Sequence, residues 1–568
     1  MLTLAEVSVQ SGSVEDPRLL LSGVSVSYPL AHFGAIIGPS GCGKTSLLQL
    51  IAGIAAGKEL GEVQWRGRNL LREDFHSSEI AYVPQFNIGH LELTTRESIQ
   101  FSAALRTRPP SGEGHRQLTT ALLEQLGMQA FADQLVSTLS GGQRRRLALG
   151  MELTNRPEIL LCDEVTSGLD PQSEDDIVRL LRSQSQEAGR LVLSVTHSLD
   201  HLEFYDSVLV LFRGVVAYHG PAEYLASYFG VDSPEQLYRR LEHRTAAEWA
   251  DRWAEQREEY AAILREKSGD KHSGALPAAE RKSALPGAAN QFRTLFVRRA
   301  LIFARCRSQI LLHLGFIFGL PLLVTLFAWH GLPAVENLSV GLTANGLVQF
   351  VEARQFLVHS SKLGSLISGI ILFQVILMTL MGANNSGREI AVERSIFEKE
   401  KLAGLSPAAY TASKAAFLFL LVCAQATWMG FFVHTVCGFP GDLPAQIGFL
   451  LLVNGAVTSI CLAISSLMRT AEQASLVSIY LVGFQLPLSG AVLALPDSLG
   501  PIIRPLVSTY CGWAGILQTL RAERFYDIVQ SVVQSPLAPP VVCVWLLTLH
   551  IVAGLIVAWL GCERRRVG

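Results

Sequence analysis

The sequence predicts an α/β domain followed by an all-α transmembrane domain, and three observations carry this prediction. In residues 1–230, short apolar runs alternate with polar helical stretches, which is the pattern of strands and helices in an α/β layer fold. Six apolar stretches follow within residues 309–568, each about 20 residues long, the length that crosses the hydrocarbon core of a bilayer. The mean hydropathy of +0.31 and the charged fraction of 17% are too apolar for an average soluble protein.

Charge and cysteine content exclude several classes of protein. The formal net charge of −2 offers no basic surplus, so we expect no nucleic-acid partner. The start of the chain, Met1–Glu6, lacks a basic region followed by an apolar core. We therefore expect no signal peptide and a cytosolic N-terminal domain. The nine cysteines lack the spacing of a metal site, and we expect most of them to be reduced and buried.

The first chemical motif lies between a buried strand predicted at 34–37 and a helix predicted at 45–51. It fits the pattern G-x-x-x-x-G-K-[ST] and consists of Gly38, Pro39, Ser40, Gly41, Cys42, Gly43, Lys44 and Thr45, followed by Ser46. Glycines let successive N–H groups and a helix N-terminus face phosphates. Lys44 would reach the β- and γ-phosphates, and the Thr45 hydroxyl would hold Mg²⁺. A glycine-rich turn that matches by chance is the alternative, but the flanking strand and helix favour a P-loop nucleotide-binding domain.

Three further apolar runs each lead to polar residues at their carboxyl ends. Ile80–Val83 leads to Gln85, Ile159–Cys162 leads to Asp163 and Glu164, and Leu191–Val195 leads to His197. Ligands of open parallel sheets bind at that edge, so these side chains can converge on the nucleotide. Asp163 is placed to hold Mg²⁺, and Glu164 to deprotonate the attacking water. Taken alone, an acidic pair at a strand end is more often a helix cap, and a lone histidine there is usually structural.

A second helix end suited to phosphate is predicted at Ser140, Gly141, Gly142 and Gln143. Ser140 can cap the helix that begins there, and the two glycines expose N–H groups to an anion. A single chain has no obvious use for two such ends around one nucleotide. Two chains facing head to tail would use both, because each chain would complete the other's site.

Taken together, these motifs resemble the nucleotide-binding domain of an ABC transporter over residues 1–230. The resemblance covers, in family order, the phosphate loop at 38–45, the Q-loop Gln85, the signature at 139–143, the Walker B stretch at 159–164, the D-loop at 167–170 and the switch His197. It implies that ATP and Mg²⁺ lie between two such domains. Two departures are Val165 in place of the usual proline and no aromatic residue near 9–11, which leaves base recognition open.

The resemblance also implies roles for individual residues. Glu164 would be the catalytic base, His197 would sense the γ-phosphate, and Gln85 would link Mg²⁺ to the membrane part. Nucleotide contacts are implied for the signature residues and Asp170, and Mg²⁺ contacts for Thr45, Gln85 and Asp163.

Residues 231–290 combine an amphipathic helix with a flexible linker. Trp249, Trp253, Tyr260 and Leu264 recur at helical spacing in a charged background. We expect this helix to pack on the nucleotide-binding domain, and a separate partner site is the less favoured interpretation. Residues 267–290 are rich in Gly, Ser, Pro and Ala, which is typical of a linker.

The second half of the chain has the pattern of a membrane domain. Residues 291–308 interleave basic and bulky apolar side chains, which predicts a connecting helix on the cytosolic membrane surface. The predicted spans lie at 309–329, 365–385, 412–437, 446–468, 474–495 and 541–561. None contains Asp, Glu or Arg, so a proton relay is not indicated and the energy should come from ATP. Basic residues concentrate at the inner span ends, as expected for a multi-pass protein of a plasma or bacterial inner membrane.

One segment between the spans resembles part of the ABC transporter G subfamily, the white and pleiotropic drug resistance type. Residues 388–401 resemble its coupling helix, which docks on the nucleotide-binding domain, although a solvated charged loop is an alternative. Residues 496–540 are too polar to span simply, and we expect an outside or interfacial segment there. Cys437 and Cys511 would both face outside in this topology, which is compatible with a disulfide.

The sequence therefore predicts an ATP-hydrolysing exporter that is half of a transporter and works with a second copy or a related half. Apolar spans suggest a lipid-like or amphipathic substrate. Polar residues within spans, such as Asn385, Gln425 and Asn454, are expected to form interhelical hydrogen bonds more often than a substrate path. A membrane-anchored mechanical or regulatory ATPase that acts on a protein partner is the alternative function.

Overall fold

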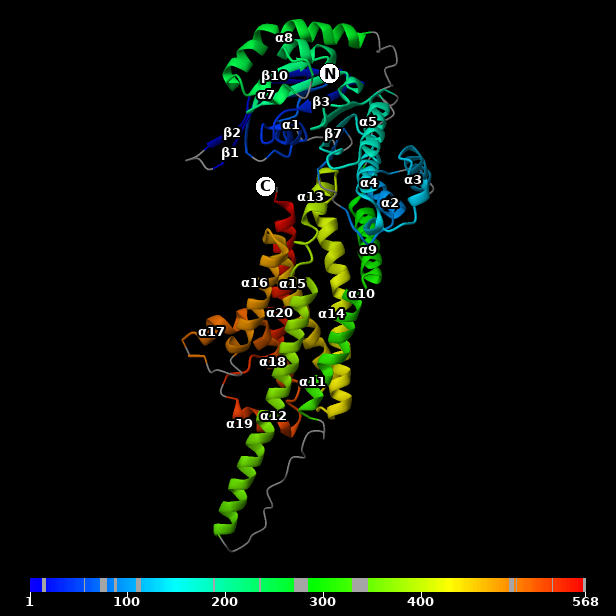
Figure 1. Ribbon diagram of the computed structural model, residues 1–568. Coiled ribbons are helices and arrows are strands. Elements are labelled where there is room, and N and C mark those ends of the chain that lie inside the picture. Colours follow the sequence, from blue (N-terminus) through cyan, green and yellow to red (C-terminus); the bar gives the residue numbers. More distant parts are fainter. Residues whose placement is uncertain are drawn as a thin grey trace. The chain divides into compact units, whose positions relative to one another are not determined.

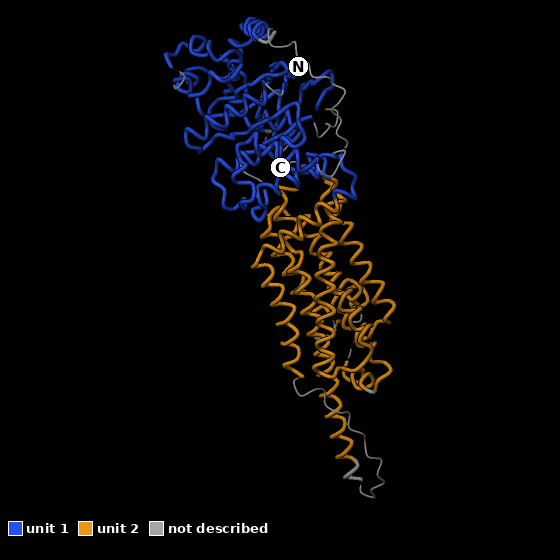
Figure 2. The backbone as a smooth tube through the Cα atoms, turned by 90° about the vertical axis from the view of Figure 1, so that its right-hand side faces the viewer, with its two compact units in different colours: residues 1–291, 398–405, 565–568 blue, residues 292–397, 406–564 orange. Residues whose placement is uncertain are grey.

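The computed structural model of the chain describes residues 1–12, 17–55, 57–71, 79–85, 89–108, 114–186, 189–233, 236–269, 285–328, 346–489, 495–496, 498–533 and 535–564. The chain forms two compact units (Figure 2). Unit 1 contains residues 1–291 and 398–405. Unit 2 contains residues 292–397 and 406–564.

Unit 1 is built on two β-sheets (Figure 1). An antiparallel sheet in the order β2-β1-β4-β5 contains β1 (Leu2–Gly12), β2 (Pro17–Tyr28), β4 (Lys58–Trp65) and β5 (Arg68–Asn69). A second sheet in the order β10-β9-β3-β8-β7-β6 contains β3 (Phe33–Ile37), β6 (Ile80–Val83), β7 (Ile159–Asp163), β8 (Leu191–Val195), β9 (Ser207–Phe212) and β10 (Val215–Gly220). Its strands from β9 to β6 are parallel, and β10 pairs with β9 in the antiparallel direction.

The parallel strands are continuous apolar runs because both faces of their sheet are covered. Every residue of β3, β7, β8 and β9 is buried, as expected for a parallel sheet that packs against other elements on both sides. The strands predicted at Ile80–Val83, Ile159–Cys162 and Leu191–Val195 are confirmed as β6, β7 and β8. Val83 pairs with Cys162, and Asp163 pairs with Val195, so the carboxyl ends of these strands lie at one edge.

Helices surround these sheets. They are α1 (Lys44–Ile51), α2 (Thr95–Arg106), α3 (Gly114–Gln125), α4 (Gly141–Leu153), α5 (Pro171–Gln186), α6 (Leu225–Phe229), α7 (Leu237–Leu241) and α8 (Ala246–Gly269), with short turns η1 (Gln129–Phe131), η2 (Val136–Thr138), η3 (Leu202–Phe204) and η4 (Ala222–Tyr224). Among the described helices, α2, α4 and α8 begin with capping boxes, which satisfy backbone donors at the helix starts, and Thr245 and Glu248 form the box of α8. Thr94 and Glu97 form the box of α2, and Ser140 and Gln143 that of α4.

The amphipathic helix predicted after residue 231 is α8, and it packs within unit 1 as expected. Its Trp249, Trp253 and Leu264 side chains are buried, and α8 contacts β10. The Tyr260 ring lies 5.2 Å from the Tyr218 ring of β10, edge to face. The apolar stripe therefore covers one edge of the six-stranded sheet. Residues 270–284 of the predicted linker lie outside the described residues.

From residue 288 onward the described elements are helical. They are α9 (Ala288–Arg305), α10 (Arg307–Leu314), the π-helical turn η6 (Gly315–Gly319), α11 (Leu320–Leu326), α12 (Gly346–Ser386), α13 (Arg394–Leu402), α14 (Pro407–Cys437), α15 (Leu443–Leu467), α16 (Ala471–Leu488), α17 (Gly500–Ile503), η7 (Arg504–Leu506), α18 (Ser508–Gln518), α19 (Arg524–Val532) and α20 (Pro540–Glu563). In unit 2, α15 packs against α12, α14 and α20. The connecting helix predicted at 291–308 corresponds to α9 and the first residues of α10.

Five helical stretches within the described residues are long and apolar enough to cross a membrane. They are Arg307–Leu326, Phe350–Ser386, Pro407–Cys437, Leu443–Leu467 and Pro540–Glu563. The fifth predicted span, at 474–495, corresponds to α16, and α16 is not among these five stretches. Glu472, Gln473 and Gln485 lower the hydropathy of that helix, and residues 490–494 lie outside the described residues. The count of six spans therefore stays a prediction, with α16 as its open element.

Two segments between the spans differ from the prediction in detail. The helix expected near 388–401 begins later, as α13 at Arg394. Ser465 explains the delay, because its Oγ accepts the backbone N–H groups of Ile390 and Ala391, each at 3.0 Å, and draws them away from helical bonding. The segment predicted at 496–540 contains α17, α18 and α19. Cys437 and Cys511 are both free, buried thiols.

Candidate nucleotide-binding site

The loop between β3 and α1 has a backbone that only glycine adopts readily. Gly38, Gly41 and Gly43 have φ angles of 149°, 76° and 105°, which L side chains rarely adopt. At Gly38 a Cβ atom would also lie 2.2 Å from the carbonyl oxygen of Leu211. The glycines of the predicted phosphate loop are therefore required by its curl and by its close approach to β9.

This loop presents the uncapped N-terminus of α1. Gly43 provides no side-chain cap to that helix, so the first backbone N–H groups of α1 are available to an anion. Ser40 and Gly41 are exposed, Ser46 is half-buried, and Cys42 is buried. Burial raises the pKa of the Cys42 thiol, which keeps it neutral within the loop.

Lys44 and Thr45 begin α1 and reach in two directions. The Lys44 Nζ donates to the carbonyl oxygens of Gly38 and Pro39 at 2.8 and 3.0 Å, so the ammonium lies over the loop. The Thr45 hydroxyl donates to Asp163 Oδ1 at 3.1 Å. The structure thus brings together Thr45 and Asp163, the two predicted metal ligands that lie 118 positions apart in the sequence.

Asp163 ends β7 and has a second partner that the sequence analysis missed. The Tyr82 hydroxyl of β6 donates to Asp163 Oδ2 at 2.9 Å. Burial raises the pKa of Asp163, and the hydrogen bonds from Tyr82 and Thr45 oppose that shift. Burial also raises the pKa of Tyr82, so its hydroxyl stays a donor. The position of Tyr82 within a strand that ends at the site was the available signal.

Glu164 lies in contact with two other predicted site residues, Gln85 and His197. Gln85 Nε2 donates to Glu164 Oε2 at 2.5 Å, and His197 Nε2 lies 2.7 Å from Glu164 Oε1. Glu164 has a φ of 49°, an unusual value for this residue type. Its N–H donates to the Val195 carbonyl at 3.2 Å, and Arg145 donates to its carbonyl oxygen at 3.0 Å. The strained backbone is thus held on two sides.

The predicted second phosphate-binding end is the start of α4. Ser140 Oγ accepts the N–H of Gln143 at 3.3 Å, and the Gln143 side chain accepts the N–H of Ser140 at 2.9 Å. Ser140 and Gly141 are exposed. Asp170 also accepts a backbone N–H at a helix start, that of Ser173 in the first turn of α5, at 3.0 Å. Gly142 lies near Ser173, since a Cβ atom there would be 3.4 Å from the Ser173 hydroxyl.

Comparison with known families identifies both parts of the chain. Residues 21–167 match the family model described as ABC transporter, and residues 290–507 match the model described as ABC-2 type transporter. The first match covers the phosphate loop, Gln85, the start of α4 and the Asp163-Glu164 pair. The second begins in α9 and ends just before α18.

Three curated relatives match this chain over different lengths. The chain is 29% identical to the ABC transporter ATP-binding/permease protein Rv1747 of Mycobacterium tuberculosis over 492 residues, which is 85% of this chain and 53% of that protein. It is 33% identical to ABC transporter G family member 4 of Arabidopsis thaliana, covering 40% of each chain. It is 36% identical to the mouse transporter ABCG2, "Broad substrate specificity ATP-binding cassette transporter", over 34% of this chain and 31% of that one.

The chain spans about half the length of the first of these relatives and less of the others. A solved dimeric ATP-binding cassette in a post-hydrolysis state, bound to ADP and Pi, is 28% identical over 39% of this chain and 99% of its own, with a TM-score of 0.36. The ATPase domain comes first and the membrane domain second, as the sequence predicts. The chain is a multi-pass membrane protein that combines a cytosolic ABC transporter ATPase domain with an ABC-2 type membrane domain.

Proposed function

We propose that this chain is one half of an ATP-driven exporter, and that two such halves clasp ATP between their ATPase domains. The second half would be another copy of this chain or a related half-transporter. The observation that supports this proposal most strongly is the meeting of Gln85 and His197 on the Glu164 carboxylate, because it assembles a base with two side chains that orient it.

Glu164 would act as the general base of ATP hydrolysis. A base must lie within hydrogen-bond reach of the proton that it takes, and its carboxylate must hold one orientation while it does so. Gln85 contacts one carboxylate oxygen and His197 the other. Movement of either side chain toward the nucleotide would free one oxygen for the attacking water. His197 would thereby report the γ-phosphate, and Gln85 would report the metal.

The phosphate loop and Asp163 would hold the triphosphate. Lys44 would exchange its bonds to the loop carbonyls for bonds to phosphate oxygens, which carry more negative charge. Thr45 and Asp163 supply the hard oxygen donors that Mg²⁺ prefers. Among the described residues no group of three His, Cys, Asp or Glu side chains could hold a metal by itself. Phosphate oxygens would therefore complete the coordination, and Mg²⁺ would supply charge that screens them.

The start of α4 supports the second half of the proposal, which is the dimer. Ser140 and Gly141 are exposed, and the capping box satisfies only two of the backbone donors at this helix start. The remaining N–H groups would face the γ-phosphate of ATP held by the partner's phosphate loop. Each ATP would then be bound by the phosphate loop of one chain and by the start of α4 of the other.

The substrate of the membrane domain would be a lipid-like or amphipathic compound. The predicted spans contain no Asp, Glu or Arg, which disfavours a hydrophilic or strongly charged substrate. ATP binding would draw the two ATPase domains together, and hydrolysis would release them. The segment 388–401 would pass this motion to the spans.

The variant Glu164→Gln tests the proposed base. ATP hydrolysis by the full chain in lipid nanodiscs should fall by about 100-fold or more, since general-base catalysis contributes about 10²–10⁴. ATP should still bind, because the phosphate loop is unchanged. The matched control is Glu124→Gln, which makes the same change at an exposed position of α3. Full hydrolysis by Glu164→Gln would remove Glu164 from this role.

Mixed dimers test whether the sites are shared. Dimers of Lys44→Ala alone and of Ser140→Arg alone should both be inactive. A dimer that pairs one chain of each kind retains one composite site with Lys44 from one chain and Ser140 from the other. It should hydrolyse ATP above the level of both parents. Equal inactivity in all three dimers would contradict a shared site.

Transport is tested in inside-out vesicles. A fluorescent phospholipid or another amphipathic probe should move in an ATP-dependent manner and should stimulate hydrolysis, with Glu164→Gln vesicles as the control. ATP hydrolysis without stimulation or movement of any probe would favour the alternative of a membrane-anchored regulatory ATPase.

A further inference from the structure

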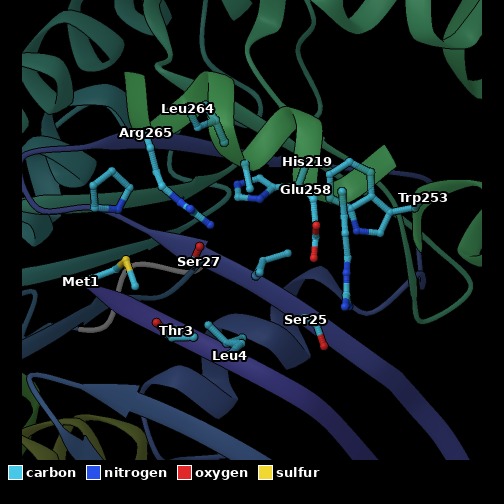
Figure 3. Close-up of a pocket in the computed structure, with 14 residues that line it drawn as sticks. Met1, Thr3, Leu4, Ser25, Ser27, His219, Trp253, Glu258, Leu264 and Arg265 are labelled. Atoms are coloured by element: carbon cyan, nitrogen blue, oxygen red, sulfur yellow. The ribbon is translucent and has the colours of Figure 1, made fainter. Parts of the chain in front are cut away.

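Unit 1 contains a cavity of about 470 Å³ that is separate from the nucleotide-binding residues. It lies between α8 and the strands β1 and β2 (Figure 3). No residue that lines it belongs to the phosphate loop, to the start of α4, or to the Asp163 and Glu164 group. The volume falls within the range of about 300–1,000 Å³ that is usual for small-molecule sites.

The cavity has a buried polar group that lacks a partner. His219 of β10 lines it and is only 5% exposed. Its Nε2 atom makes no hydrogen bond within the described part of the chain. A buried polar atom left without a partner destabilises the fold, because it has lost its hydrogen bonds to water. The fold therefore retains a donor or acceptor that a ligand in the cavity can satisfy.

Neighbouring rings hold the imidazole in place and keep it neutral. The His219 ring lies 4.9 Å from that of Tyr28 and 6.4 Å from that of Trp253, in edge-on contacts. Burial lowers the pKa of His219 to about 3, and nearby His32 adds to this shift. A neutral imidazole with a fixed ring can hydrogen-bond to an amide, hydroxyl or ring N–H of a ligand.

The α8 side of the cavity is positively charged. Arg257 and Arg265 both line it, with Ala261 between them on the same helix. Glu258 is the one carboxylate among the lining residues, so these three charged side chains sum to +1. Arginine binds carboxylates through a planar pair of donors. The net positive charge of these side chains therefore favours an anionic ligand.

The remaining walls favour a ligand with an apolar body. Trp253 and Leu264 of α8 face Leu4 of β1 across the cavity, while Ser25 and Ser27 of β2 place hydroxyls between these apolar surfaces (Figure 3). An aromatic wall stacks well against a flat ring. The cavity thus joins an apolar slot, one buried imidazole and a cationic rim.

We propose that this cavity binds a small amphipathic carboxylate with an aromatic or short aliphatic body. The carboxylate pairs with Arg257 and Arg265, the body lies against Trp253 and Leu264, and a polar group of the body reaches His219. This site is independent of the proposed transport function, because it uses none of the residues assigned to ATP or to the membrane path.

The proposal is tested by equilibrium dialysis of the full chain in lipid nanodiscs, with empty nanodiscs subtracted. The probes are radiolabelled indole-3-acetate, whose ring N–H can reach His219, and 8-hydroxyoctanoate, whose terminal hydroxyl can do so. Two analogues with the same indole ring serve as comparisons: indole-3-acetamide, which is neutral, and tryptamine, which is cationic. At least one carboxylate should bind saturably at one site per chain. Indole-3-acetamide should bind at least about tenfold more weakly than indole-3-acetate, and tryptamine should not bind saturably.

Two variants locate the site. Ala261→Trp fills the cavity and should abolish saturable binding. The double variant Arg257→Gln/Arg265→Gln removes only exposed charges and should weaken carboxylate binding about tenfold while leaving amide binding unchanged. Arg116→Gln removes an exposed arginine of α3 and should bind like the unaltered chain. Retained ATP binding by each variant confirms that unit 1 is folded.

Three results would overturn the proposal. One is the failure of both carboxylates to bind saturably up to millimolar concentration. Another is binding that persists unchanged in Ala261→Trp, which would place the site elsewhere. The third is equal affinity for indole-3-acetate and its amide, which would remove the cationic rim from recognition.

Discussion

Replacing Glu152 by glutamine should destabilise unit 1 more than any exposed charge change. Glu152 lies near the end of α4 and is buried between two cations. Arg106 of α2 donates to both of its carboxylate oxygens, at 2.8 and 3.1 Å, and Lys399 Nζ lies 2.8 Å from Oε1. The Arg106, Glu152 and Lys399 side chains are only 4%, 5% and 9% exposed. A neutral amide in place of this carboxylate would leave two buried cations without a counter-charge.

The magnitude follows from the cost of a broken buried ion pair, which is about 3–5 kcal/mol. The titration of Glu152 gives an independent figure. Burial alone would raise its pKa, but Arg106 and Lys399 outweigh burial and lower the pKa from 4.5 to about 2. A shift of this size corresponds to about 3 kcal/mol of stability at neutral pH. Both routes therefore predict a loss of about 3 kcal/mol or more.

Hydrogen–deuterium exchange of the full chain in nanodiscs measures this loss. Amides of α4 and of residues 398–405, which belong to unit 1, should exchange about 100- to 3,000-fold faster in Glu152→Gln. The control is Asp133→Asn, which removes the carboxylate of the exposed pair with Arg96. It should change exchange by less than about fivefold. Equal exchange in the two variants would refute the reasoning.

The pH dependence supplies a second check on the same residue. The folded pKa of Glu152 is below its unfolded value, so its stabilisation is present above about pH 4.5 and is lost as the pH falls toward 2. The difference in stability between the unaltered chain and Glu152→Gln should therefore shrink by about 2 kcal/mol between pH 6 and pH 3. A difference that stays constant over this range would contradict the ion-pair account.

Three further predictions concern other elements. Thr94→Ala removes the bond from the Glu97 N–H to the α2 cap and should cost about 1 kcal/mol, measured by exchange of α2 amides. Gly38→Ala places a Cβ atom 2.2 Å from the Leu211 carbonyl at a φ of 149° and should abolish nucleotide binding, measured with a fluorescent ATP analogue. Gln425→Leu removes three buried bonds to asparagines of α12 and α15 and should cost about 2 kcal/mol, measured by unfolding of the membrane domain in mixed micelles.

Local patterns were sufficient to predict the strand ends and the loop of the candidate site. A parallel strand buried on both faces is a short apolar run, and the residue after it lies at the ligand edge of the sheet. Asp163, Glu164 and His197 could be placed by this rule alone. The phosphate loop could be predicted because its glycines are fixed by backbone geometry rather than by distant neighbours.

Contacts between distant segments could not be predicted in the same way. Tyr82 binds Asp163 and Arg145 binds Glu164 through the fold. Tyr82 lies in a predicted strand that ends at the site, but no spacing in the sequence pairs either residue with its partner. The start of α13 moved to Arg394 because Ser465 captures two backbone N–H groups from the preceding turn. A local helical pattern does not contain this competitor, so the sequence predicted an earlier start. The same limit applies to α16, whose polar residues obscure a span.

The segment around α13 carries charges that are buried in both units, and this gives the coupling proposal its physical basis. In unit 2, Glu389 contacts Arg299 at 2.5 Å and Lys414 at 3.0 Å, while Lys399 contacts Glu152 within unit 1. Separating a buried ion pair is costly, because each partner would be left as a buried charge without a counter-charge. Such pairs therefore tolerate little displacement. Lys399, which pairs with Glu152 in unit 1, thus lies ten positions along the chain from Glu389, which pairs with Arg299 and Lys414 in unit 2. A solvated charged loop would have neither attachment, and the coupling role of residues 388–401 stays a proposal.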